Sequence, residues 1–203
     1  MSRNTEVAAQ YQQIADWFDN ARNKTLVEKK YLDHVLTFAK PEGKLLDLGC
    51  GSAEPMAAFF IGHGFQVTGI DIAPRMIELA QSRFPDHDWQ VGDIRKTGLS
   101  GKYDVILSWD SFFHLTRDDQ RAMFVSFAQH AAAGAVLLFN TGTEDGESYG
   151  NMEGHDIHHA SLSVAEYKTL LENNGFSVIV LNQTDKDCGG RTVWLAQNNR
   201  KEL

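Results

Sequence analysis

Three aspartates stand at the ends of three successive apolar runs of this sequence. Asp47 lies in LLDLG, Asp71 in VTGID and Asp93 in VGDI. Because the carboxyl ends of parallel strands meet at one edge of a sheet, we expect these carboxylates to lie close together. Asp71 follows Gly51 at about the 20-residue spacing at which a carboxylate accepts hydrogen bonds from ribose hydroxyls. Aspartate also caps turns, but three in succession indicate a nucleoside site.

A glycine-containing loop, DLGCGSAEP, joins the first of these runs to a helical pattern. Gly49 and Gly51 would let the backbone turn and a ligand approach without a Cβ in the way. A dinucleotide fingerprint requires Gly or Ala where Glu54 stands, and a phosphate-cradling loop ends in Lys-Ser/Thr. Glu54 and Asp47 would repel a pyrophosphate at the helix N-terminus. The loop therefore favours a cationic ligand over an anionic one.

Further candidates follow the later strands. Asp110 and His114 lie in WDSFFHL, and the ordinary pKa of histidine, about 6.5, suits His114 to proton transfer. Alternatively, His114 packs as a structural side chain and Asp110 orders a loop. Arg191, in the final turn DCGGR, could pair with a substrate carboxylate or phosphate, or be an exposed turn residue.

The polar, glycine-rich stretch 141–160 is expected to form a long loop, and such loops in compact domains are often functional. It carries His155, His158 and His159 with Asp156 between them, which raises the question of a metal. Because histidine clusters are common in loops, we predict no metal site. We expect His158 to act in catalysis and His155 to contact the substrate.

Alternating strand and helix patterns must position these residues. The predicted strands are 44–49, 65–71, 89–94, 103–109, 135–141, 176–183 and 192–197, and the predicted helices between them are 54–64, 73–84, 116–131 and 163–175. This alternation predicts an α/β fold with a mostly parallel sheet and helices on both faces. The last two strands are joined directly, so they should be antiparallel.

The first forty residues have helical periodicity, and two roles are open for them: packing on the sheet, or a lid over the site. We expect one domain over 1–203, in which 1–40 is a helical lid and 41–203 a Rossmann-like core with an insertion near 141–160. A length of 203 residues fits one domain.

Composition excludes several classes of protein. The net charge is −8 and no basic run is present, which disfavours a nucleic-acid partner. No apolar run approaches the ~18 residues of a membrane span, and no signal-peptide pattern opens the chain. Two cysteines are too few for a disulfide framework. We therefore expect a cytoplasmic protein without a membrane partner; a homodimer is left open.

Four segments resemble, in order, the motifs of the class I S-adenosylmethionine-dependent methyltransferases of small-molecule type: LLDLGCGSAEP, FQVTGIDIAPRMIELA, VGDI and YDVILSWDSFFHL. The resemblance extends over 11–197, and the tail resembles a bacterial, mostly uncharacterised subset. It implies a Rossmann-like sheet of seven strands with the last antiparallel. Glu54-Pro55 departs from the pattern, because many members carry a third glycine there.

The resemblance also implies a cofactor site. Its residues would be Tyr11, Arg22, Asp47, Gly49 and Gly51 around the methionine end, Asp71 at the ribose, Ile72, Met76, Asp93 and Ile94 around the adenine, and Trp109 beneath the methyl group.

The function expected from these observations is transfer of a methyl group from S-adenosylmethionine to an O or N atom of a small molecule. The alternative is a protein that binds S-adenosylmethionine or S-adenosylhomocysteine without transferase activity. A nicotinamide-dependent oxidoreductase is disfavoured by Glu54 and Asp93. Since the cofactor carries the reactive group, the protein has mainly to align the acceptor, and the absence of a catalytic triad is compatible with this chemistry.

Overall fold

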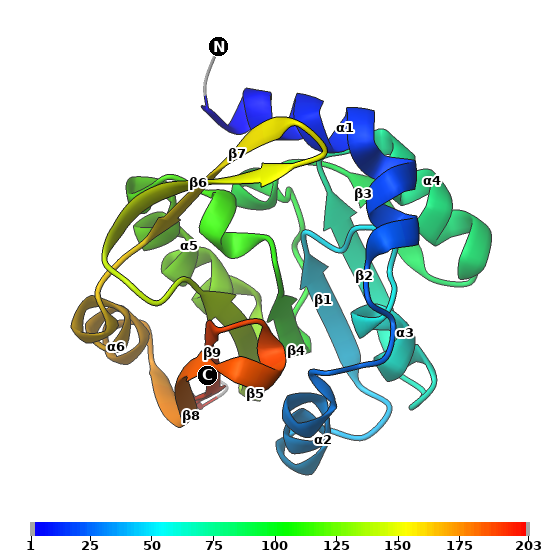
Figure 1. Cartoon of the computed structure of the whole chain (residues 1–203). Helices are drawn as coiled ribbons and strands as arrows, with labels where there is room; N and C mark the ends of the chain where they lie inside the picture. The colour runs from blue at the N-terminus through cyan, green and yellow to red at the C-terminus, as the bar shows by residue number, and fades with distance from the viewer. Residues whose placement is uncertain (1–2, 202–203) are drawn as a thin grey trace.

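Seven strands form one sheet in the order β3-β2-β1-β4-β5-β9-β8 (Figure 1). In this computed structural model, which describes residues 3–201, the strands are β1 (Lys44–Leu48), β2 (Gln66–Asp71), β3 (Asp88–Val91), β4 (Tyr103–Ser108), β5 (Ala131–Thr141), β8 (Phe176–Asp185) and β9 (Arg191–Asn198). Strands β1 to β5 are parallel, and β9 is antiparallel to both β5 and β8. The predicted α/β sheet with an antiparallel last strand is confirmed.

Helices cover both faces of this sheet. They are α1 (Arg3–Ala21), α2 (Lys29–Phe38), α3 (Met56–Ile61), α4 (Pro74–Arg83), α5 (Arg117–His130) and α6 (Val164–Asn173), with short 3-10 turns η1 (Ile94–Lys96), η2 (Phe112–His114) and η3 (Lys186–Cys188). Side chains of α2, α3 and α4 pack in one core cluster, and those of α5 and α6 in the other. Thr116 and Ser163 cap α5 and α6 with their side-chain oxygens.

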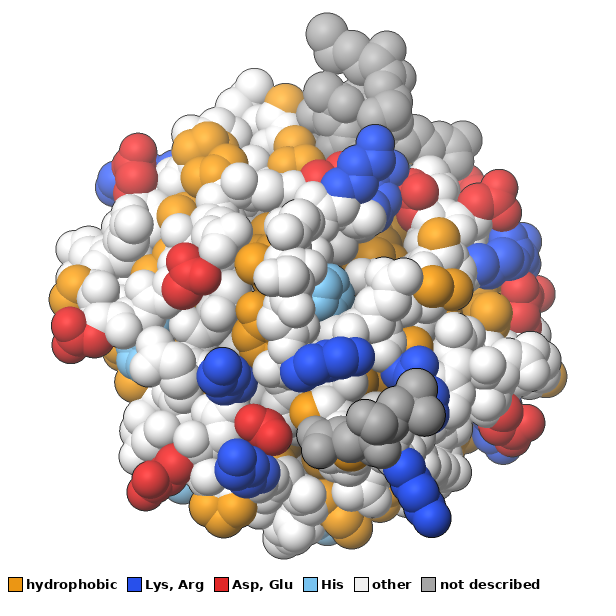
Figure 2. Space-filling view, turned by 180° about the vertical axis from the view of Figure 1, so that it is seen from behind, with side chains coloured by type: hydrophobic (Ala, Val, Ile, Leu, Met, Phe, Trp, Pro, Cys, Tyr) orange, Lys and Arg blue, Asp and Glu red, His pale blue; other side chains and the backbone are white. Residues whose placement is uncertain are grey.

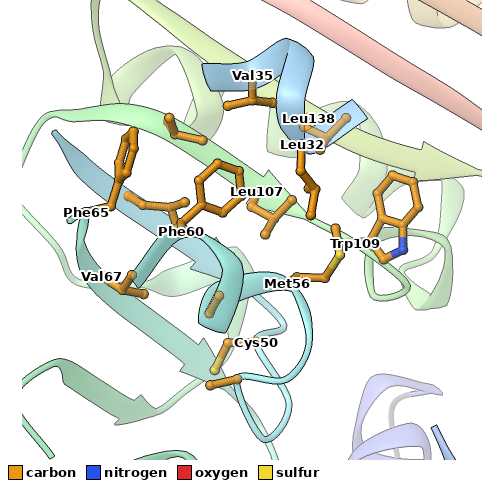
Figure 3. Close-up of a cluster of buried hydrophobic side chains, with 14 of the residues drawn as sticks. Leu32, Val35, Cys50, Met56, Phe60, Phe65, Val67, Leu107, Trp109 and Leu138 are labelled. Atoms are coloured by element: carbon orange, nitrogen blue, oxygen red, sulfur yellow. The ribbon is translucent and has the colours of Figure 1, made fainter. Parts of the chain in front are cut away.

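The first core cluster shows how the parallel strands become buried. Leu107 of β4 and Leu138 of β5 pack against Leu32 and Val35 of α2 and Phe60 of α3 (Figure 3). Strand β1 is buried along four of its five residues, as expected for a central parallel strand covered on both faces. The rigid sheet places the ends of β1, β2, β3 and β4 at one edge.

The segment predicted as a long loop instead forms a β-hairpin, β6 (Gly146–Met152) and β7 (His155–Ser161). Glu153 and Gly154 join the two strands, and both have positive φ, 50° and 80°. A two-residue turn with both φ positive suits the right-handed twist of a hairpin, and Gly154 adopts it without strain. The many glycines and polar residues obscured this turn in the sequence.

The N-terminal forty residues divide between the two roles that the sequence left open. Helix α2 packs on the sheet next to β5, while α1 lies across the strand ends beside the β6–β7 hairpin (Figure 1). Gln10 Nε2 of α1 donates to the main-chain oxygen of Asp156 at 3.2 Å. Within residues 3–201, no helix combines the length and apolarity needed to cross a membrane.

Candidate active site

A cavity lies where the ends of β1, β2 and β4 meet the underside of α1. Its volume is about 130 Å³. Its lining residues are Val7, Tyr11, Phe18, Arg22, Asp47, Gly49, Cys50, Gly51, Ser52, Glu54, Met56, Asp71, Ile72, Met76, Asp93, Ile94, Trp109, Asp110, Ser111, His114 and Leu115. All eleven residues expected to bind a cofactor line this one cavity.

Asp47 is the most deeply placed carboxyl of the cavity, with 3% of its surface exposed. Burial and the nearby charge of Asp71 raise its pKa to about 8, and Arg22 opposes that rise. A carboxyl in this condition readily gives up its proton when a cation binds beside it, because the cation stabilises the charged form.

Asp71 joins the glycine loop to the turn after β2. Its Oδ2 accepts from the Gly51 amide and its Oδ1 from the Ala73 amide, both at 2.9 Å. Burial raises the pKa of Asp71, and these amides oppose the rise. Gly49 has φ +84°, and a Cβ there would lie 2.2 Å from the Ser111 Cβ. Glycine is therefore required at Gly49 by both conformation and space.

Asp93 caps η1 and already has a strong partner. Its two carboxylate oxygens accept from Arg95 Nε at 2.9 and 3.0 Å. Burial alone would raise the pKa of Asp93, but the bonds from Arg95 outweigh burial and bring it below its usual range. The predicted adenine contact thus has to share this carboxylate with Arg95. Ile72, Met76 and Ile94 supply the apolar wall beside it.

Tyr11 of α1 and His114 of η2 meet across the cavity. The Tyr11 hydroxyl lies 2.9 Å from His114 Nε2, and His114 Nδ1 lies 3.1 Å from the His158 main-chain oxygen. A carbonyl only accepts, so Nδ1 carries the proton and Nε2 accepts from Tyr11. Burial lowers the pKa of His114 to about 4 and raises that of Tyr11. Both side chains are therefore uncharged near neutral pH.

Asp110 connects three parts of the chain at the acceptor end of the cavity. Its carboxylate accepts from Arg22 Nη1 at 3.0 Å, Arg191 Nε at 2.7 Å and Asn140 Nδ2 at 2.6 Å. Asp110 has φ +53°, a left-handed conformation that costs a non-glycine residue free energy. The predicted substrate residues Asp110 and Arg191 are therefore paired with each other.

The hairpin histidines lie on two faces of β7. His158 is buried, and its Nε2 lies 3.1 Å from Glu147 Oε2, so its ring is tied to the hairpin itself. His155 and His159 share the opposite face, because side chains alternate along a strand. The His159 ring lies 5.0 Å from the His114 ring. The sequence analysis did not assign a role to His159, and the period-two pattern of β7 would have separated it from His158.

A second cavity adjoins the first at the root of the hairpin. Its walls are Phe113, Thr141, Gly142, Thr143, Glu144, Asp145, Gly146, Glu147, Ser148, His159, Ala160, Ser161, Gly189, Gly190 and Arg191. Hydroxyl groups, carboxylates and glycine backbone dominate this lining. Arg191 and His159 separate it from the first cavity, because Arg191 bonds Asp110 and His159 packs on His114.

Asp19 links α1, the helix that lies over the cavity, to the glycine loop. The sequence analysis did not assign this role to it. Its carboxylate accepts two hydrogen bonds from Arg83, at 2.7 and 2.5 Å, and one from Ser52 Oγ at 2.5 Å. The Arg83 bonds lower the pKa of Asp19 to about 2, more strongly than burial raises it. These bonds join α1, α4 and the glycine loop. Asp19, Ser52 and Arg83 are far apart in the sequence, and their spacing does not predict the contact.

Among residues 3–201, no group of three or more His, Cys, Asp or Glu side chains is arranged to hold a metal ion.

Comparison with known proteins identifies relatives of this arrangement. A family model described as a methyltransferase domain matches residues 20–181. A phosphoethanolamine N-methyltransferase of Zea mays is 31% identical over 160 residues, which are 72% of this chain and 31% of that protein. A dTDP-4-amino-2,3,4,6-tetradeoxy-D-glucose N,N-dimethyltransferase of Saccharopolyspora spinosa is 33% identical over 101 residues, 48% of this chain and 40% of that protein.

Solved structures share the fold. The magnesium protoporphyrin IX methyltransferase of Synechocystis PCC 6803, determined with bound SAM, superposes with a TM-score of 0.73 at 18% identity and covers 98% of both chains. An amino pentose methyltransferase of Micromonospora echinaspora gives 0.70 at 19% identity, with 91% of this chain and 95% of that one covered. The chain spans about a third of the maize protein, 31%. Because the family model covers most of its length, this chain belongs to the methyltransferase domain family.

Proposed function

We propose that this protein transfers a methyl group from S-adenosylmethionine to an O or N atom of a small molecule. The observation that carries the proposal is the charge of the first cavity. Five carboxyl side chains line it, Asp47, Glu54, Asp71, Asp93 and Asp110. Glu54, Asp93 and Asp110 each pair with a basic side chain, so the negative charge that a cationic nucleoside would meet comes from Asp71 and from Asp47 once a cation has displaced its proton. The same two carboxyl groups disfavour a dinucleotide pyrophosphate. Membership in the methyltransferase domain family supports the same reading.

The residues present fit this cofactor. Asp71 offers carboxylate oxygens to the ribose hydroxyls, the glycine loop leaves room for the methionine chain, and Asp47 provides a negative charge near the sulfonium. When bound, S-adenosylmethionine supplies an electrophilic methyl group on a positively charged sulfur. Tyr11 and Phe18 of α1 roof the cavity and exclude water from it.

Tyr11 and His114 provide a route for the proton of a protonated acceptor. The acceptor gives its proton to the Tyr11 oxygen while Tyr11 passes its own proton to His114 Nε2. The imidazolium that forms keeps its Nδ1–H bond to the His158 carbonyl. A histidine with a pKa of about 4 is neutral at physiological pH and so has its lone pair available. Burial thus makes His114 a weaker base than the ordinary pKa of histidine, about 6.5, had suggested.

The acceptor would reach the methyl group from the second cavity. Its polar lining fits a hydrophilic molecule, and Arg191 could exchange Asp110 for an anionic group of that molecule. His155 shares a face of β7 with His159 but lines neither cavity, and its contact with the acceptor remains a proposal. The names of the relatives from maize and Saccharopolyspora spinosa, both N-methyltransferases, support a nitrogen acceptor.

The proposal also covers the location, the partners and the oligomeric state of the protein. A cytoplasmic location is part of this proposal, and the net charge of −8 supports the absence of a nucleic-acid partner. A homodimer is compatible with this proposal and is tested by the mass of the protein in solution.

Titration calorimetry with S-adenosylmethionine, S-adenosylhomocysteine and NAD in parallel tests the cofactor. We expect binding of the two sulfur nucleosides and none of NAD; binding of NAD alone would refute the proposal. Formation of S-adenosylhomocysteine over a panel of amines, amino acids, phosphobases and amino sugars then tests turnover. With an acceptor in hand, His114→Ala should lower kcat and leave the affinity for S-adenosylhomocysteine unchanged.

A further inference from the structure

The two ring nitrogens of His159 have no hydrogen-bond partner among the described residues. The ring is half-buried in the wall of the second cavity, where it packs against Phe113 and His114 with centroid separations of 4.9 and 5.0 Å. Neither nitrogen is among the enclosed polar atoms that lack a partner, so both can be reached from the cavity. A ligand in the second cavity can therefore hydrogen-bond to this side chain.

The two neighbouring histidines have no nitrogen to offer to such a ligand. His114 uses both of its nitrogens, one with the Tyr11 hydroxyl and one with the main-chain oxygen of His158. The ring of His158 is bonded to Glu147 through Nε2, and its Nδ1 is enclosed without a partner. Of these three histidines, only His159 can receive a ligand from the second cavity.

Gly150 of β6 leaves the room that the His159 ring occupies. A Cβ on Gly150 would lie 2.9 Å from Cε1 of that ring, closer than real Cβ contacts come. Gly150 lies within the strand and its φ is not positive, so its backbone conformation would also suit alanine. The ring alone excludes a side chain here, and Gly150→Ala would displace the imidazole without removing it.

The His159 ring is uncharged near neutral pH. Burial lowers the pKa of His159, the nearby His158 and Arg191 lower it further, and Asp110 opposes them. A neutral imidazole has one nitrogen that donates and one that accepts. The accepting nitrogen suits an N–H or O–H group of a ligand.

The second cavity also carries a carboxylate without a partner. Its other charged side chains are compensated: Asp145 pairs with Arg117, Glu147 with His158, and Arg191 with Asp110. Glu144 makes no ion pair or hydrogen bond with a described residue. Its charge favours a cationic ligand, and the hydroxyl groups of Thr143 and Ser148 in the same lining favour one that itself carries hydroxyl groups.

We infer that the second cavity binds an amine that carries hydroxyl groups, and that an N–H of this amine donates a hydrogen bond to the free ring nitrogen of His159. Glu144 attracts the positive charge, and His159 holds the amine nitrogen at the boundary with the first cavity. This assignment rests on the proposed function, in which the bound amine is the methyl acceptor. It makes His159 the residue that selects amines with an N–H group over quaternary amines, which have none.

The first test observes the His159 ring in the full-length protein at pH 7, saturated with S-adenosylhomocysteine. The signals that are missing from the ¹H–¹⁵N imidazole spectrum of His159→Phe are those of His159. Ethanolamine, a small amine with a hydroxyl group, is then added to the wild type, and we expect it to move these signals. Choline has the same charge and a hydroxyl group but no N–H, and it should leave them in place. Signals that ethanolamine does not move, or that both amines move equally, overturn the inference.

The second test measures the affinity for the two amines. The wild type should bind ethanolamine roughly tenfold more tightly than choline, since a hydrogen bond to a charged group is at stake. His159→Phe keeps an aromatic ring but has no nitrogen, so it should lose this preference. Glu144→Gln should weaken the binding of both amines and keep the preference, and the exposed control His34→Gln should change neither. A preference that persists in His159→Phe contradicts the inference.

The outcomes for the cofactor and for the amine are distinguishable. If the wild type binds no sulfur nucleoside but ethanolamine moves the His159 signals, the proposed cofactor is wrong and this binding site stands. If the wild type binds the nucleosides while ethanolamine leaves His159 unchanged, this inference alone is refuted.

Gly150→Ala takes the place of His159→Phe if the latter does not fold, which the loss of S-adenosylhomocysteine binding would show. In Gly150→Ala we expect weaker binding of ethanolamine, because the imidazole is displaced, and an unchanged affinity for S-adenosylhomocysteine. An unchanged affinity for ethanolamine overturns the inference.

Discussion

Asp71 serves both the protein and its proposed ligand, so a substitution there has to preserve shape. Asp71→Asn keeps an acceptor for only one of the amides of Gly51 and Ala73, which bond different oxygens, and it cannot accept from both ribose hydroxyls. We expect S-adenosylhomocysteine to bind roughly ten- to a hundredfold more weakly, since hydrogen bonds to a charged group are lost. Calorimetry measures this, with Asp86→Asn on an exposed loop as the control. Unchanged affinity would remove Asp71 from the ribose site.

Asp47 makes binding depend on pH. Its pKa is raised to about 8 from 3.8, so the folded, ligand-free protein holds a proton that the unfolded chain has lost. The stability this contributes is present below pH 3.8 and is lost as the pH rises through about 8. A cationic ligand favours the ionised form, so binding near pH 7 should release protons, and affinity should rise toward pH 8.

The number of protons released can be measured by titrating the protein with S-adenosylmethionine at pH 7 in buffers of different ionisation enthalpy, because the observed heat then changes with the buffer. Asp47→Asn should abolish the release, whereas Glu54→Gln, a change of another carboxyl in the cavity wall, should leave it. Proton release that persists in Asp47→Asn would assign it to another group, such as Asp71, whose pKa burial also raises.

At the scale of elements, Asp19 connects α1 to two other parts of the molecule. The bidentate bond from Arg83 and the bond from Ser52 link this helix to α4 and to the glycine loop. Asp19→Asn should lower the free energy of unfolding by about 1–3 kcal/mol, the range for hydrogen bonds to charged groups. Asp16 lies on the same helix and makes an exposed ion pair with Arg75 of α4. Asp16→Asn should lower the free energy of unfolding by less than about 0.5 kcal/mol.

Urea unfolding at pH 7 and at low pH separates the two aspartates further. The pKa of Asp19 is lowered to about 2 from 3.8, so its contribution is present above pH 3.8 and is lost as the pH falls through about 2. In Asp19→Asn this part of the acid dependence should disappear. An equal loss of stability in both variants at pH 7 would contradict a special role for Asp19.

The sequence predicted well those elements that are determined by residues close together in the chain. Buried strands such as β1 show as apolar runs, and Ser163 with Glu166 marks the start of α6. That these acids meet at one cavity could be predicted because Asp47, Asp71 and Asp93 stand at or just beyond the carboxyl ends of their strands. The β6–β7 hairpin was missed because its glycines and polar residues resemble a loop, and because Glu153 is an unusual turn residue.

Contacts between distant segments could not be predicted in the same way. The Tyr11–His114 bond joins residues 103 positions apart, and the pairs of Asp110 with Arg22 and Arg191 depend on how α1 and the β8–β9 turn fold back over the sheet. Neither composition nor periodicity predicts contacts between residues that are far apart in the sequence. For the same reason His158 was favoured over His159, although the ring of His159 lies against His114.

At the scale of the molecule, the site lies between segments that are far apart in the sequence. The cavity wall combines the α1 roof, the glycine loop and η2, whereas α6 and β8 lie at the far side of the sheet (Figure 1). Acidic and basic side chains are interspersed on the face seen from behind (Figure 2). Because the cavity wall is drawn from α1, the glycine loop and η2, binding should act on these parts.

Hydrogen exchange gives this expectation a measurable form. Saturating S-adenosylhomocysteine should slow exchange in α1, in residues 49–54 and in η2, because a ligand between these parts must leave before any of them opens. Exchange through local opening of α6 and β8 should change little, because the ligand stays bound while these parts open. In Asp19→Asn the protection of α1 should fall while that of η2 persists, because the roof then opens separately from the strand ends. Uniform protection over the whole chain would mean that α1 has no independent opening, and the roof would then be part of the rigid core.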